Sequence, residues 1–134
     1  MRKTVKLLIV GMLLVNIFLL TACGGGSSIE SIKSKFKDEG YTTKTFSKAD
    51  KDKIAGCVDG FSGSKKIDDV SIGITINKFS KKALADEYSP KMESGGFVKS
   101  IKGVYVCVVY DGTGTAASSV NVQAAIELFD SCFT

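Results

Sequence analysis

Apolar residues recur along the chain with two different periods, and these periods predict a mixture of strands and helices. The clearest strand is the segment 70–77, in which Val70, Ile72, Ile74 and Ile76 alternate with small or polar residues. A period of two with one apolar face is typical of antiparallel sheets, whereas strands buried in parallel sheets are apolar on both faces. The segment therefore predicts an antiparallel strand with one face against the core.

Three segments have apolar residues at helical spacing instead. The first spans 29–38, the second begins at about Lys81 with Ser80 as its cap, and the third covers about 118–132. Pro90 is expected to kink or end the second helix. The predicted apolar faces, in chain order, consist of Ile29, Ile32 and Phe36, then Leu84, Tyr88 and Met92, then Val122, Ile126, Phe129 and Phe133.

Further strands are predicted between these helices, with a polar loop or short turn at 47–53. They cover 41–46, 54–61 and a hairpin formed by 97–101 and 104–110. The resulting order is α-β-β-β-α-β-β-α. Strands that follow one another without an intervening helix favour an α+β fold over a doubly wound parallel sheet. We therefore expect one small domain at 29–134, with about five mostly antiparallel strands and helices packed on one face.

The N-terminal segment has the pattern of an export signal rather than of a domain. Arg2, Lys3 and Lys6 precede an almost wholly apolar run from Leu7 to Leu20. This run of 14 residues is shorter than the roughly 20 residues that a membrane-spanning helix needs. A basic start followed by a short apolar run is typical of a secretory signal peptide, although an uncleaved N-terminal membrane helix is the alternative.

The apolar run ends in Leu20-Thr21-Ala22-Cys23, which resembles the lipobox of bacterial lipoproteins at all four positions. The resemblance covers only the first 23 residues. It implies that the Cys23 thiol receives a diacylglycerol group and that signal peptidase II cuts between Ala22 and Cys23. Residues 1–22 would then be a removed signal peptide, and 23–28 a lipidated cysteine with a Gly/Ser tether. Two or three acyl chains make a stable membrane anchor.

Removal of the signal peptide changes the charge of the protein. The full chain has 18 basic and 14 acidic residues, a net charge of +4, and loss of the three basic residues in 1–22 leaves 15 against 14, or +1. A nucleic-acid-binding domain would carry a strongly basic surface, so no nucleic-acid partner is expected. Outside the cytoplasm the remaining Cys57, Cys107 and Cys132 can form disulfides. Their number is odd, so one bridge with one free thiol and no bridge at all are both open, and the sequence does not choose among the three pairings.

The residue types argue against most catalytic and metal chemistry. The chain has no histidine, which removes histidine-activated nucleophiles and histidine-based zinc sites. We therefore predict no catalytic, metal or cofactor residues. The alternative is a small envelope enzyme that uses carboxylates around Asp111. The segment Asp111-Gly112-Thr113-Gly114-Thr115 partly resembles the phosphoryl-accepting motifs of P-type ATPases and haloacid-dehalogenase-like phosphatases, but it is expected to be a glycine-rich connection.

The strand 104–110 is apolar on both faces. If helices cover only one face of the sheet, the stripe formed by Tyr105, Cys107 and Val109 would be exposed as an interaction surface. The alternative is a central strand that is covered on both faces. Together these features predict a lipid-anchored protein facing outside the cytoplasm, with a non-catalytic domain that binds a partner in the cell envelope. A minor solute-binding lipoprotein is a further alternative.

Overall fold

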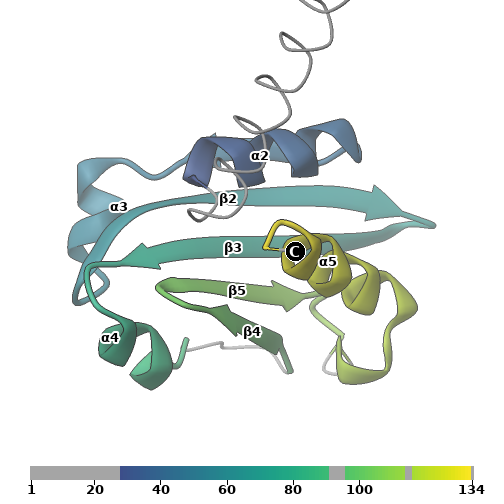
Figure 1. Ribbon diagram of the computed structural model, residues 1–134. Helices are drawn as coiled ribbons and strands as arrows, with labels where there is room; N and C mark the ends of the chain where they lie inside the picture. The colour runs from purple at the N-terminus through teal and green to yellow at the C-terminus, as the bar shows by residue number, and fades with distance from the viewer. Residues whose placement is uncertain (1–27, 91–95, 114–115, 134) are drawn as a thin grey trace, which may run out of the picture.

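The computed structural model describes residues 28–90, 96–113 and 116–133 and shows one antiparallel sheet with helices packed against it (Figure 1). The fold is α+β, as the sequence predicts. The elements, in chain order, are α2 (Ile29–Asp38), β1 (Thr42–Thr45), α3 (Lys48–Asp52), β2 (Cys57–Ile67), β3 (Val70–Phe79), α4 (Lys82–Glu87), β4 (Val98–Lys102), β5 (Tyr105–Tyr110), the 3₁₀ turn η1 (Ala116–Ser118) and α5 (Val120–Ser131).

The five strands lie in the order β1-β2-β3-β5-β4, and every neighbouring pair is antiparallel. The long β2–β3 hairpin turns through Asp68 and Asp69, both of which have positive φ angles, 49° and 66°. Aspartate tolerates this left-handed conformation better than most residues, which suits it to a two-residue hairpin loop. The chain then crosses to the edge strand β4 and returns through β5, so β5 lies inside the sheet.

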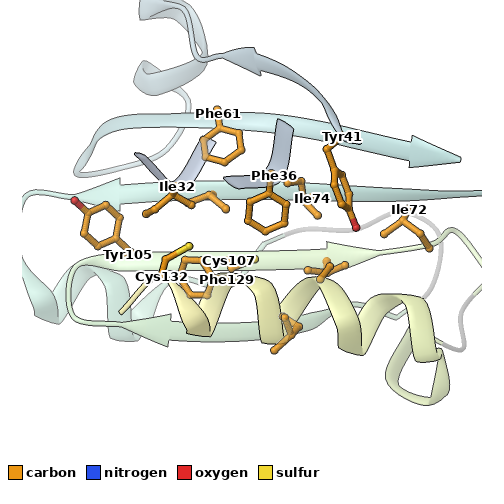
Figure 2. Packing of buried hydrophobic residues seen from close by; sticks show 14 of the residues in the cluster. Ile32, Phe36, Tyr41, Phe61, Ile72, Ile74, Tyr105, Cys107, Phe129 and Cys132 are labelled. Atoms are coloured by element: carbon orange, nitrogen blue, oxygen red, sulfur yellow. The ribbon is translucent and has the colours of Figure 1, made fainter. Parts of the chain in front are cut away.

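The main core lies between α2 and α5 and one face of the sheet, which we call the helical face (Figure 2). Phe36 of α2 packs its ring edge-on against Tyr41, with 5.2 Å between centroids, and lies 6.1 Å from Phe61 of β2. Both helices are capped at their first residue: the Ser28 side chain accepts from Ser31 N in α2, and the Ser119 side chain accepts from Val122 N in α5. Such caps satisfy backbone donors that helices leave unpaired at their N-termini.

The opposite side, which we call the second face, is covered by a smaller apolar cluster. Its buried members are Phe79, Ala85, Val106 and Val108, and Ala85 belongs to the short helix α4. On this face, the rings of Phe46 and Tyr110 lie against the strand residues Gly60 and Gly73. A side chain added at Gly73 would come within 2.4 Å of the Tyr110 ring, so the ring lies against bare backbone. The prediction of helices on one face thus holds for α2 and α5, whereas α4 packs on the other face.

Three local features differ from the sequence-based expectation. The segment 47–53, expected to be a loop or turn, contains the single-turn helix α3, which Ser47 and Asp50 cap reciprocally. Strand β2 continues to Ile67 because its backbone pairs with β3 along its whole length, although a bulge interrupts the register near Cys57. Helix α4 has Lys81 as its N-cap without any side-chain cap, and it ends at Glu87, before Pro90.

Candidate functional site

The predicted interaction stripe on β5 does not lie on an open face. Tyr105, Cys107 and Val109 are 7%, 0% and 0% exposed and belong to the main core on the helical face. The other side of the same strand is closed as well, because Val106 and Val108 lie in the second-face cluster. The prediction of an exposed stripe is therefore wrong, and β5 is a central strand covered on both faces.

Asp111 lies in the turn that follows β5, and its carboxylate is engaged locally. Its Oδ1 accepts hydrogen bonds from the Thr113 backbone N at 3.0 Å and from the Thr113 hydroxyl at 2.7 Å. These bonds lower the pKa of the Asp111 carboxyl, so the group is ionised and held within its own turn. Gly114 and Thr115 lie outside the described residues. A nucleophilic aspartate would need a pocket with converging catalytic groups, and this geometry gives that alternative no support.

Cys107 is an unreactive thiol in its reduced form. Burial raises its pKa well above the ordinary value of 9.0, and the nearby Asp130 carboxyl and Cys132 thiol add to the rise. The reactive form of cysteine is the thiolate, so in the folded domain this buried thiol is unsuited to act as a catalytic nucleophile. Cys57 and Cys132 also have raised pKa values, in both cases mainly through burial.

The Cys107 thiol leads to a prediction about alkaline stability. Because the folded state holds its proton more tightly than the unfolded chain, this stabilisation is complete below the ordinary thiol pKa of 9.0 and is lost as pH rises above it. In the presence of reductant, we expect the free energy of unfolding to fall as pH rises above 9.0, and Cys107→Ala to weaken that dependence. The nearby Tyr41, whose own pKa is raised mainly by burial, adds to the effect at higher pH. Urea unfolding over a pH series measures this, and an unchanged slope in Cys107→Ala would contradict it.

The residues predicted to form the membrane anchor, Ala22 and Cys23, lie outside the described residues, as do the rest of the signal peptide and the tether as far as position 27. Within the described part of the chain, no helix has the length and apolar character needed to cross a membrane. The same part contains no group of three or more His, Cys, Asp or Glu side chains placed to hold a metal ion.

Two grooves indent the described surface, and they differ in how well their polar groups are satisfied. The smaller, of about 360 Å³, lies between α5 and the Lys65 region of β2. There the Lys65 ammonium donates to the Glu39 carbonyl at 2.6 Å and lies 5.7 Å above the centre of the Tyr41 ring. The Lys65 ammonium of this groove is thus already engaged by protein groups.

The larger groove, of about 500 Å³, lies on the second face beside α4. Apolar side chains form most of its lining, and Lys53 and Glu87 add one charge of each sign. An apolar lining with a few polar groups is typical of a binding site. The full lining consists of Lys53, Ile54, Ala55, Phe79, Leu84, Glu87, Tyr88, Ser89 and Pro90. We call it the α4 groove.

Asn77 lies beside this groove and is the one buried polar residue among those that the structure describes, at 0% exposed. It is on β3, two positions before the groove residue Phe79. Neither its Oδ1 nor its Nδ2 makes a hydrogen bond of standard geometry. Burial raises the pKa of the groove residue Tyr88, and a weak side-chain hydrogen bond with Asn77, outside the standard geometric limits, opposes that rise. A buried amide without partners costs stability.

The sequence does not reveal this site because Asn77 ends the alternating strand segment and belongs to its face of small or polar residues. The one available signal was its place directly after Ile76 in a strand whose other outward residues are smaller. Tyr88 interacts with Asn77 and packs against Phe79, with 5.2 Å between the two ring centroids. The position of Tyr88 depends on the packing of α4 against the second face, and the periodicity of a strand does not predict that packing.

The unsatisfied amide leads to a stability prediction. We expect Asn77→Leu to raise the free energy of unfolding by about 1–2 kcal/mol, because leucine has the same branching and number of side-chain heavy atoms and no polar atom to leave unpaired. Thr43→Val is the matched control, since the Thr43 hydroxyl is buried without a partner but lies on β1, away from the groove. Urea unfolding measures both variants. A loss of stability in Asn77→Leu would mean that the amide is satisfied.

Comparison with family models, with curated proteins and with solved structures finds no match for this chain. The candidate site therefore stands on the geometry of the α4 groove and of Asn77.

Proposed function

We propose that this protein is a bacterial lipoprotein, anchored through Cys23 outside the cytoplasm, whose domain is a non-catalytic binding module of the cell envelope. The α4 groove is the proposed binding surface. The observation that carries the proposal is the buried Asn77 amide beside that groove, which makes no hydrogen bond of standard geometry. Residues that bind a ligand often stabilise the fold less than another residue would at the same position. A buried polar side chain that weakens the fold is therefore expected at a functional position.

The resemblance of Leu20-Thr21-Ala22-Cys23 to a lipobox supports the location. The five residues that follow Cys23 end at Ser28, the N-cap of α2. At full extension they span at most about 18 Å, since each residue covers roughly 3.3–3.6 Å. The domain would thus stay close to the membrane surface, where partners are other envelope components rather than distant soluble proteins.

The binding proposal is tested by photo-crosslinking in intact cells. A photoreactive amino acid at Ala55, an exposed residue in the lining of the α4 groove, is expected to give a crosslinked product of discrete mass. The same amino acid at Lys37, exposed on α2, is the matched control and is expected to give none. Asn77 is fully buried behind the groove lining, so Asn77→Leu acts through Tyr88, whose side chain interacts with the amide, and should reduce the yield at Ala55.

The proposal fails if Ala55 gives no crosslinked product, or if Ala55 and Lys37 give the same products in equal yield. It also fails if Asn77→Leu folds normally and leaves the yield at Ala55 unchanged. Thr43→Val serves again as the control for a change in stability alone, because it removes an unpartnered hydroxyl at a distance from the groove.

A further inference from the structure

The sheet divides the three cysteines of the domain between its two faces. Cys57 begins β2 and packs with the second-face cluster, where its thiol donates to the Asp59 carbonyl at 3.2 Å. Cys107 and Cys132 are both buried in the main core on the helical face. The sheet backbone therefore separates Cys57 from the other two thiols. Of the three pairings that the sequence leaves open, only Cys107 with Cys132 is compatible with the fold.

The end of α5 is held against the part of the sheet that carries Cys107 by contacts on both sides of Cys132, whose thiol donates to the Leu128 carbonyl at 3.4 Å. The Ser100 hydroxyl, on the strand residue paired with Cys107, donates to Asp130 Oδ1 at 2.6 Å. On the other side, the Phe133 ring lies 5.4 Å from the ring of Tyr105, two positions before Cys107 on the same face of β5. Figure 2 shows Cys107 and Cys132 in one layer with Phe129 between sheet and helix.

We propose that Cys107 and Cys132 form an intramolecular disulfide that locks the C-terminal helix α5 onto the central strand β5. The Cys132 thiolate attacks an external disulfide, taken from a protein or small-molecule oxidant, and one thiolate of the oxidant leaves. The Cys107 thiolate then attacks the Cys132 sulfur and displaces the second. The two cysteines lose two electrons and two protons, and the oxidant disulfide is reduced to two thiols.

The burial of both cysteines determines when during folding the disulfide can form. Cys107 is fully buried and Cys132 is 8% exposed, and burial keeps both thiols protonated. Cys132 directly follows the last residue of α5, and terminal turns open more readily than core strands. The bridge therefore forms while the chain folds after export, or when the last turn of α5 opens. In the cell this requires the oxidising compartment of the proposed function.

The bridge closes the segment from Cys107 to Cys132 and is expected to raise the midpoint of thermal unfolding by roughly 10 °C or more. It also removes the titration of the Cys107 thiol, so the alkaline loss of stability should become weaker once the bridge forms. Reduction with dithiothreitol should reverse both effects.

The test is thiol mapping of the full chain, extracted from membranes in detergent and alkylated in denaturant without reduction. Trypsin releases one peptide from Gly103 to the C-terminus that contains both cysteines, since no Lys or Arg follows Lys102. We expect this peptide to lack two hydrogen atoms and to accept alkyl groups only after reduction. Cleavage before Asp111 and Asp130 then separates the two cysteines into peptides joined only by the bridge.

A second sample is treated with oxidised glutathione after purification. It separates the question of whether the two cysteines can pair from the question of whether they are paired in the cell. If the extracted protein is reduced but glutathione produces the Cys107–Cys132 bridge, the pairing holds and its formation in the cell fails, while the location itself is tested by the lipid on Cys23. The pairing itself is overturned if both cysteines are alkylated without reduction after glutathione treatment, or if Cys57 is found in a bridge. Cys57→Ser should keep the bridge, and Cys132→Ser, close to the C-terminus, should make thermal unfolding insensitive to reductant.

Discussion

Replacing Phe36 by alanine is expected to lower the free energy of unfolding by about 3–5 kcal/mol, as is typical when a large aromatic residue is removed from a core. Phe36 is fully buried and joins α2 to the sheet through its contacts with Tyr41 and Phe61. Its loss leaves a cavity at the centre of the helical face. Because small domains have only about 5–15 kcal/mol of stability in total, the variant should be close to unfolding at ordinary temperature. Equilibrium unfolding in urea measures the change.

The matched control is Val120→Ala in α5, since Val120 is 82% exposed. Surface substitutions of this kind usually change stability by less than about 0.5 kcal/mol. If Phe36→Ala lowers the free energy of unfolding by less than about 1 kcal/mol, far below the cost expected for a cavity, the helical face is not the main core of the domain.

Replacing Cys23 by serine is expected to abolish lipid attachment completely. A hydroxyl does not take the place of the thiol that receives the diacylglycerol group in lipoproteins, and signal peptidase II acts on the lipidated chain. We therefore expect Cys23→Ser to lose all incorporation of labelled palmitate and to accumulate with residues 1–22 still attached. Metabolic labelling followed by gel electrophoresis measures both changes. Membrane fractionation alone is less informative, because an uncleaved apolar segment also binds membranes.

Cys57→Ser provides the control for this experiment, because it removes a cysteine of the domain and leaves the lipobox intact. It should incorporate palmitate at the level of the unaltered chain. Equal labelling of Cys23→Ser and Cys57→Ser would mean that the lipid is carried elsewhere or that the lipobox resemblance is misleading.

The fold class was predictable because its strongest signals are local. The alternation of Val70, Ile72, Ile74 and Ile76 specifies one buried face and hence the central strand β3. The apolar spacing in 29–38 likewise predicts α2 with its observed bounds. The second half of β2 was not predictable in this way, since 62–66 is made of Ser, Gly and Lys. That half is a strand because its backbone pairs with β3, a long-range effect that local propensity does not contain.

The candidate site was much less predictable, because it depends on which elements cover which face. Periodicity shows that Tyr105 and Val109 share a face of β5, but it does not show that α2 and α5 cover that face. It also does not show that α4 covers the end of β3 and buries Asn77. The pairing of Cys107 with Cys132 became specific only when the sheet placed Cys57 on the opposite face. In each case the missing information is the packing of elements distant in sequence.

The measurement that tests the account most directly is the mass of the intact protein extracted from the membranes of its own cells. We predict a chain that begins at Cys23 and carries a diacylglyceryl group on that residue, with or without a further acyl chain on its amino group. Such a product would place the domain outside the cytoplasm, in agreement with the proposed binding role of the α4 groove. A chain that still begins at Met1, or one whose Cys23 is unmodified, would contradict the account.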